Sequence, residues 1–173
     1  MNPEQASFLF NAIFLPALKN EFRATKQVME AIPDGNGDYR PDPNAKSAME
    51  LAWHIAAAEN RFLAGIAAGA FDFAPNHKPD SITTGAGIAA WYAESFNANV
   101  EKLSKLSGEQ LAKIIDFRGI LQLPAVAYCQ FNMHHAIHHR GQLSTYLRPM
   151  GGQVPAIYGE SYDSAKAKAS AAS

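Results

Sequence analysis

Four histidines occur within six consecutive positions in the C-terminal part of the chain: His134, His135, His138 and His139. On a helix, residues four positions apart differ by only about 40° in direction, so their side chains project from one face. His135 and His139 therefore form one pair, and His134 and His138 form a second pair turned by about 100°. Either pair can offer two imidazole nitrogens to a divalent metal ion. A stable site normally needs at least three protein ligands, so a third must come from another helix.

His54 is the candidate for this third ligand. It lies in the apolar segment LAWHIAAA, one position from Ile55 and three from Leu51, so its ring should point at or beside the core. His77 lies in the loop segment APNHKPD and is expected to be solvated. Three neutral imidazoles leave a coordination position open for water or substrate, which is typical of a catalytic metal site. A single histidine on an Ala-rich helix is, on spacing alone, more often a core residue than a ligand.

The polar residues that share a face with each histidine pair favour His135 and His139 as the ligands. Their stripe on the helix contains four further polar side chains: Tyr128, Asn132, Gln142 and Tyr146. We expect Gln142 and Tyr146 to hydrogen-bond the ligand rings or a water on the metal, which would fix the histidine tautomers. The other pair aligns with Gly141 and Thr145, and its role stays open. A surface cluster that binds metals adventitiously is the alternative interpretation of all four histidines.

Other reactive residue types have simpler interpretations. Cys129 is turned away from His135 on the same helix, and we interpret it as a buried residue that takes no part in chemistry. Arg140 can anchor an anionic substrate or pair with a carboxylate on another helix, and the ion pair is the favoured role. Glu50, Glu59 and Glu94 are candidates for a further ligand or a general base, but a solvated helix face is the favoured location of each.

Two long helices are expected in the first part of the chain. Apolar residues at three- and four-residue spacing predict an amphipathic helix from Glu4 to about Ile32, with a bend at Pro16. The segment PDGNGDYRPDPN is rich in turn-forming residues and predicts a connection. Ser47 followed by Glu50 has the form of a capping box, so a second helix should start there and end near Gly69.

Two more helices are expected in the second part of the chain. Apolar residues from Ile88 to Leu103 predict a third helix that ends around Ser107, and the segment 114–123 can be extended. Pro124 has the character of a first helical residue and predicts a fourth helix that runs to Arg148. We predict an all-α four-helix bundle, with one domain over residues 1–163 and a frayed tail over 164–173.

Composition and charge exclude several classes of protein. The chain has 173 residues, of which 47% are hydrophobic, with 15 Lys and Arg against 16 Asp and Glu and a formal net charge of −1. Such a balance gives no basic surface for nucleic acid or for an anionic membrane. No apolar run approaches the roughly 18 residues of a transmembrane helix, and no positive charge precedes the apolar N-terminal segment as in a signal peptide. With its single cysteine, the chain is expected to be a cytoplasmic protein.

The residues of the last expected helix resemble a known family signature. The segment HAIHHRGQL at 135–143, followed by LRPMG at 147–151 and VP at 154–155, resembles the DinB/YfiT-like signature of HxxxHRGQ, Leu-Arg and Gly-x-x-Pro. His54 within LAWHIAAAENRFL matches the histidine of the second helix in that family. The resemblance covers nearly the whole chain, except the tail after Asp163.

This resemblance implies a four-helix bundle with up-down-down-up topology, often a homodimer, that carries a divalent metal ion on His54, His135 and His139. Zinc, nickel and iron are all suitable ions. Relatives include thiol S-transferases that use low-molecular-weight thiols, a mycothiol-dependent isomerase and a domain of iron sulfoxide synthases. The expected function is therefore that of a metal-dependent thiol S-transferase or hydrolase that acts on a small molecule. A stress-related bundle that binds a metal or ligand without catalysis is the alternative, and a purely structural dimer is a third hypothesis.

The first expected helix offers a surface for the partner of such a homodimer. It carries four phenylalanines at Phe8, Phe10, Phe14 and Phe22, which is more aromatic surface than one bundle needs on this helix.

Overall fold

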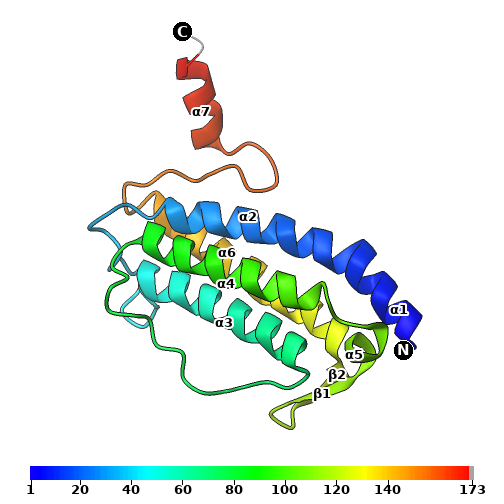
Figure 1. Cartoon of the computed structure of the whole chain (residues 1–173). Helices are drawn as coiled ribbons and strands as arrows, with labels where there is room; N and C mark the ends of the chain where they lie inside the picture. Colours follow the sequence, from blue (N-terminus) through cyan, green and yellow to red (C-terminus); the bar gives the residue numbers. More distant parts are fainter. Residues whose placement is uncertain (172–173) are drawn as a thin grey trace.

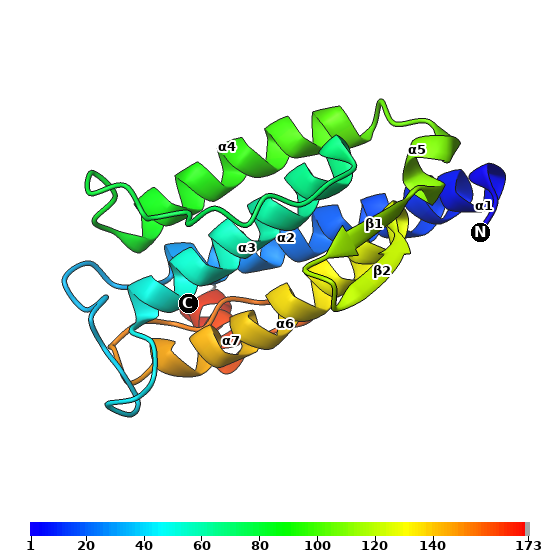
Figure 2. The same cartoon turned by 90° about the horizontal axis from the view of Figure 1, so that it is seen from below.

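The computed structural model describes residues 1–171 as a bundle of four long helices with short additions at its ends (Figures 1 and 2). In chain order the elements are α1 (Pro3–Phe8), a π-helical segment (Leu9–Phe14), α2 (Leu15–Glu30), α3 (Ala48–Ala68), α4 (Gly85–Leu103), α5 (Gly108–Ala112), β1 (Ile114–Phe117), β2 (Leu121–Pro124), a 3-10 turn (Ala125–Ala127), α6 (Tyr128–Leu147) and α7 (Tyr162–Ala171). The long helices are α2, α3, α4 and α6. The predicted all-α four-helix bundle is confirmed, with one two-stranded hairpin added.

The long connection between α3 and α4 determines the topology of the bundle. Residues 69–84 run back along the molecule, so α3 and α4 point in the same direction while α2 and α6 point the other way (Figure 1). The four helices therefore have the up-down-down-up order that the family resemblance implies. Helix α3 contacts both α4 and α6. This arrangement places α3 directly beside the histidine-rich helix α6.

The first predicted helix is one helical run whose hydrogen-bonding pattern changes before Pro16. The structure has α1, then the π-helical segment Leu9–Phe14, then α2. Pro16 has no N–H to donate and its ring crowds the carbonyl of Ala12, so the wider π turn accommodates the proline. The structure thus has a π-helical segment before Pro16, and the bend itself stays a prediction.

Helix α3 begins and ends at the residues that the sequence predicts. The Ser47 hydroxyl accepts a hydrogen bond from the Glu50 N–H at 3.2 Å, and the Glu50 carboxylate accepts one from the Ser47 N–H at 2.9 Å. This is the predicted capping box, and it satisfies backbone donors at the helix start. Gly69 ends the helix with a positive φ of 68°, a conformation that glycine adopts without steric cost.

Helix α6 begins four residues later than its predicted start. Pro124 is the last residue of β2, where it pairs with Ile114 across the antiparallel hairpin, and the 3-10 turn lies between the strand and the helix. A proline at a strand end and a proline at a helix start look alike in sequence, because both positions tolerate the φ near −65° that the proline ring imposes and the missing N–H. The hairpin confirms the prediction of an extended segment at 114–123.

The C-terminal segment differs from the frayed tail predicted for 164–173. Up to Ala171 it is the helix α7, which has no buried residue and projects from the bundle in Figure 1. Its Ala-rich sequence has high intrinsic helix propensity, which explains a helix without packing. The last two positions of the predicted tail, 172 and 173, lie outside the described residues. Within residues 1–171, no helix has both the length and the apolar character that crossing a membrane requires.

The core beside the histidines contains apolar residues from α3 and α6. Leu51 and Ile55 of α3 and Ala136 and Leu143 of α6 are all buried in the same hydrophobic cluster. Because each of these residues lies within four positions of a cluster histidine on its helix, the packing that buries them also fixes where the imidazole rings lie.

The phenylalanines of the first helical run do not form one exposed surface. Phe10 is buried in the core, whereas Phe8 is exposed. Phe22 stacks on Phe96 of α4 with ring centroids 4.0 Å apart, so its ring belongs to the bundle interior. The aromatic surface left for a partner is therefore smaller than the sequence suggests.

Candidate metal centre

The structure brings together His54 of α3 with His135 and His139 of α6. The Nε2 atom of His54 lies 3.0 Å from that of His135 and 3.2 Å from that of His139. The ligand atoms of all three residues lie within 4.8 Å of one another, and each residue is half-buried. Metal–nitrogen bonds of about 2.0–2.1 Å in a tetrahedral site place ligating nitrogens about 3.3 Å apart. The observed spacing therefore fits three imidazoles that face one ion.

Hydrogen bonding alone accounts poorly for this cluster. Nδ1 of His139 lies 2.8 Å from the amide oxygen of Gln142, so Nδ1 must carry the proton and Nε2 must have a lone pair in the neutral ring. If His54 donates its one Nε2 proton to His139, the contact between His54 and His135 has no proton of its own. A cation between the three Nε2 lone pairs satisfies these three atoms at once, so the donor set fits a metal ion.

Gln142 orients one of the candidate ligands, as the sequence predicts. Its amide oxygen accepts from Nδ1 of His139, and its amide nitrogen lies 3.1 Å from Nε2 of His138. Tyr146 is buried, and its ring packs edge-on against Tyr39 with centroids 5.7 Å apart. Among the described residues Tyr146 makes no hydrogen bond to a histidine. Its hydrogen bond to a ligand ring or to a water on the metal stays a prediction.

Burial favours the neutral form of two imidazoles of the cluster, those of His54 and His135. The pKa of His135 is lowered to about 4. Burial is the largest cause, and the neighbouring His139, His54 and His138 make smaller contributions. The pKa of His54 is lowered as well. Burial is again the largest cause, the neighbouring His139 is the second, and the charges of Lys46 and Arg61 make smaller contributions. Unprotonated nitrogen is the form that binds a metal ion, so the surroundings favour the ligating form.

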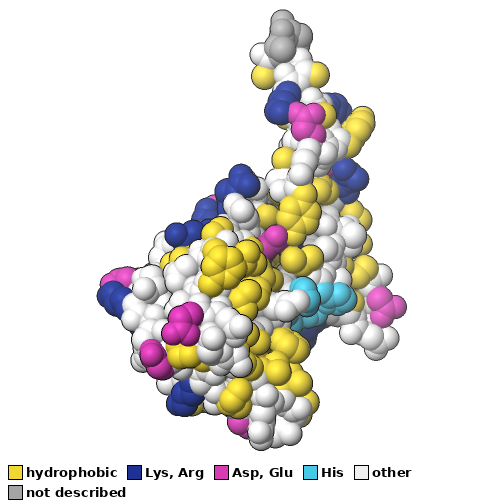
Figure 3. All heavy atoms as spheres, turned by 90° about the vertical axis from the view of Figure 1, so that its right-hand side faces the viewer, with side chains coloured by type: hydrophobic (Ala, Val, Ile, Leu, Met, Phe, Trp, Pro, Cys, Tyr) yellow, Lys and Arg dark blue, Asp and Glu magenta, His cyan; other side chains and the backbone are white. Residues whose placement is uncertain are grey.

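The remaining histidines lie apart from this cluster. His134 and His138 are exposed on α6, and His77 is exposed in the connection between α3 and α4. Histidine side chains form a patch on the face shown in Figure 3, with hydrophobic side chains beside it. The structure therefore distinguishes the two pairs on α6 in the way that the sequence favours. Only the pair with His135 and His139 approaches His54.

Arg140 has the structural role that the sequence favours. It is only 2% exposed, and its guanidinium lies 2.7 Å from the carboxylate of Glu21 on α2. It also donates hydrogen bonds to the backbone carbonyl of Glu21, to the Thr25 hydroxyl and to the Tyr158 hydroxyl. The buried cation thus connects α6 to α2 and to the segment after α6, and takes no part in the histidine cluster.

Glu59 is where the sequence interpretation is wrong. It is buried in α3, not placed on a solvated face, and its Oε1 atom has no hydrogen-bond partner among the described residues. Burial raises the pKa of Glu59 to about 7. Nearby Tyr92 and Asn132 and the charge of Arg140 lower this pKa, but they offset the effect of burial only in part. Glu59 lies four positions after Ile55 and four before Leu63, so helical spacing places it on the buried face, against the general tendency of glutamate to be exposed. Glu50 and Glu94 are exposed as expected.

Cys129 is buried, as predicted. Burial raises the pKa of its thiol to about 12, so the reactive thiolate is not formed near neutral pH.

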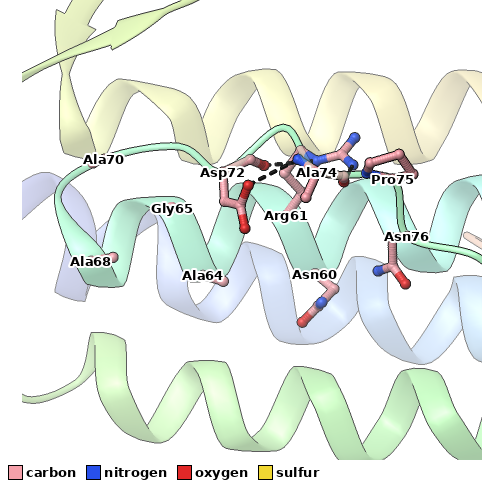
Figure 4. A pocket seen from close by; sticks show the side chains of 10 residues that line it. All are labelled: Asn60, Arg61, Ala64, Gly65, Ala68, Ala70, Asp72, Ala74, Pro75 and Asn76. Carbon is pink, nitrogen blue, oxygen red and sulfur yellow. Dashed lines mark hydrogen bonds between the residues drawn. The ribbon is translucent and has the colours of Figure 1, made fainter.

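Two cavities lie near α3, and only one of them contains a candidate ligand. The first, which we call the His139 cavity, has a volume of about 270 Å³ and is lined by Ala45, Lys46, Leu51, His139, Gln142, Thr145 and Tyr146. The second has a volume of about 320 Å³ and lies between α3 and residues 70–76 (Figure 4). Among the described residues, no histidine lines the second cavity, so of these two cavities the His139 cavity is the one that adjoins the cluster.

Comparison with known proteins places these features in a family. The family model described as "DinB family" matches residues 10–170, which includes most of the C-terminal segment that the sequence resemblance leaves out. Two proteins of Bacillus subtilis are similar in sequence. YjoA is 31% identical over 129 residues, or 73% of this chain and 82% of YjoA, and YrdA is 29% identical over 150 residues, or 84% and 86%.

Solved structures show the same fold. The crystal structure of YjoA, a DinB-like protein, superposes with a TM-score of 0.67 at 29% identity and covers 82% of this chain and 94% of that one. The crystal structure of a DinB-like protein from Bacillus cereus superposes with a TM-score of 0.71 at 28% identity, and covers 84% and 95%.

Proposed function

The chain belongs to the DinB family, and on that premise we propose that it binds one divalent metal ion through His54, His135 and His139 and acts on a small molecule there. The observation that carries the proposal is the convergence of three Nε2 atoms from two helices. Zinc, nickel and iron all accept imidazole ligands. A set of three histidines leaves a coordination position for the small molecule.

The residues around the cluster orient one of its imidazoles and exclude water from one side of it. Gln142 holds the Nδ1 proton of His139 and thereby directs the Nε2 lone pair of that ring toward the other two histidines. The buried side chains of Leu51 and Ile55 exclude water from the side of the cluster that faces the core. A divalent cation bound there supplies Lewis acidity, which lowers the pKa of a thiol or water that it binds.

We propose a metal-dependent transfer to or from a low-molecular-weight thiol, or a hydrolysis, as the reaction. The test is an assay of the zinc-, nickel- and iron-loaded protein with a panel of small thiols and electrophiles. Turnover should need the metal, disappear with a chelator and return when metal is added back. His135→Ala should abolish it, whereas the matched variant His134→Ala, which changes an exposed histidine on the same helix, should retain it.

The alternative is a bundle that binds a metal or ligand without catalysis. One observation favours it: no carboxylate lines the His139 cavity, so no acidic side chain is in place to exchange a proton with a substrate. Stoichiometric binding across the panel without turnover would support this alternative and contradict the catalytic proposal. A homodimer also stays a proposal, and light scattering should then give twice the 18.7 kDa of the chain.

A further inference from the structure

The surroundings of the three-histidine cluster carry positive charge. Lys46 lines the same cavity as His139, and Arg61 follows His54 by two turns on α3. Among the described residues, no carboxylate lines the His139 cavity. Three neutral imidazoles bring no negative charge to a divalent ion. The cluster therefore lies in surroundings that favour an anionic molecule.

Arg61 is already engaged elsewhere. Its guanidinium donates to the backbone carbonyls of Asp72 at 3.1 Å and of Ala74 at 2.9 Å, beneath the segment that follows α3 (Figure 4). It lines the second cavity and not the His139 cavity. Its charge contributes to the field at the cluster, but its donors face the other cavity.

Lys46 remains available to a molecule in the His139 cavity. It lines that cavity together with His139 and Gln142, and it makes no ion pair with a carboxylate among residues 1–171. The charge of Lys46 also acts on Glu50, but the Glu50 carboxylate is held by Arg40 at 2.8 Å and by the Ser47 N–H. The Lys46 ammonium is thus the one charged donor that lines this cavity.

We propose that the His139 cavity selects small molecules that carry a carboxylate, and that the Lys46 ammonium pairs with this carboxylate while the other end of the molecule reaches the metal ion. Leu51 and Tyr146 line the same cavity and provide apolar contact for the part between the two ends. The inference rests on the proposed metal site and names the substrate class of that site. Lys46 is its specificity-determining residue.

The test uses the full chain loaded with Co²⁺ and two thiols that differ only in the second group, 3-mercaptopropionate and 2-mercaptoethanol. The readout is the near-ultraviolet absorption band that a thiolate gives when it binds Co²⁺. Lys46→Met should weaken the binding of 3-mercaptopropionate by about fivefold, the range of one solvated ion pair, and leave that of 2-mercaptoethanol unchanged. Lys46→Arg should keep the preference, and raising the ionic strength should reduce it in the wild type.

The control variant is Lys105→Met, which removes an exposed lysine that pairs with Glu101 at the end of α4. It should change neither affinity. Equal losses for both thiols in Lys46→Met, or no loss for either, would overturn the role of Lys46 while the metal site stands. A wild-type protein that retained no Co²⁺, or gave no thiolate band with either probe, would overturn the proposed metal function and this inference with it.

Discussion

Arg140 shows at the scale of a single residue how a charge is accommodated inside this bundle. Its charge is neutralised by Glu21, its donors meet hydroxyl and carbonyl groups, and its guanidinium lies over the Tyr158 ring at 5.0 Å from the centroid. Removing one partner of such a pair leaves an uncompensated charge in the interior, which costs more than the pair itself contributes.

We therefore predict that Arg140→Ala lowers the free energy of unfolding by about 3–5 kcal/mol. Urea denaturation of the metal-free protein measures this change. The matched control is Lys105→Ala, which removes one partner of an exposed ion pair and should leave stability unchanged within error. An Arg140→Ala protein as stable as the control would show that the buried pair has no structural role.

Glu59 gives a second prediction, on the dependence of stability on pH. Its pKa is raised from 4.5 to about 7 in the folded state, so the folded chain holds a proton that the unfolded chain has released. The stability that this provides is fully present below about pH 4.5 and is lost as the pH rises to about 7. The loss amounts to about 3 kcal/mol at 1.36 kcal/mol per pKa unit.

Glu59→Gln keeps the shape of the side chain and cannot ionise. The difference in unfolding free energy between Glu59→Gln and the wild type should therefore grow in favour of the variant from pH 5 to pH 8. Comparing the two proteins at each pH cancels the titration of the histidines, which is the same in both. A difference that does not change with pH would mean that Glu59 keeps an ordinary pKa.

The chemistry of the site was predictable at the residue scale where spacing decides it. His135 and His139 share a face because they are four positions apart, and Gln142 follows His139 by one turn. The burial of Glu59 follows from the same kind of spacing, because Glu59 lies four positions after Ile55 and four before Leu63, but the usual exposure of glutamate argues against it.

At the scale of elements, the helix ends were predictable where a nearby side chain caps them. Ser47 and Glu50 form their capping box within four residues, so the start of α3 needs no information from the rest of the fold. Pro124 is different, because its strand depends on pairing with Ile114, ten positions away. The π-helical segment before Pro16 has a local cause, but a proline can be accommodated by a kink or by a wider turn, so the sequence alone does not choose between them.

Close packing between elements gives a third prediction. Gly85 begins α4 where a Cβ atom would lie 2.4 Å from the carbonyl oxygen of Met29 and 2.7 Å from Cβ of Ile32. Backbone cannot move aside easily, so Gly85→Ala should lower the free energy of unfolding by about 1–3 kcal/mol. Gly141 is the matched position within α6, where a Cβ would meet no atom within 4 Å.

Gly141→Ala should raise the unfolding free energy by about 0.5–1 kcal/mol, because alanine loses less conformational entropy in a helix than glycine does. Chemical denaturation of both variants measures the two effects. If Gly85→Ala raised the unfolding free energy as Gly141→Ala is expected to do, the tight contact between α2 and the start of α4 would not exist in solution.

At the scale of the whole molecule, the candidate metal site joins two helices that are far apart in sequence. His54 is separated from His135 by 81 positions, and the two rings meet because α3 and α6 are neighbours in the bundle. The spacing on α6 was predictable from sequence, but the approach of α3 depends on the topology. The family resemblance supplied that part of the prediction.

A metal ion that binds only the folded arrangement must stabilise the whole bundle. At a free metal concentration of about 100 times Kd, the gain is about 2.7 kcal/mol. Adding zinc or nickel should therefore raise the Tm of the wild type and leave that of His135→Ala unchanged. Equal shifts in both proteins would assign the effect to other groups, such as the exposed His134 and His138.

The most direct test of the central claim is the metal content of the untagged protein, purified without a chelating resin. Elemental analysis should find about one divalent metal ion per chain in the wild type and in His134→Ala, and almost none in His135→Ala. A wild-type protein that is free of metal and also fails to bind added zinc, nickel or iron would contradict the three-histidine metal site.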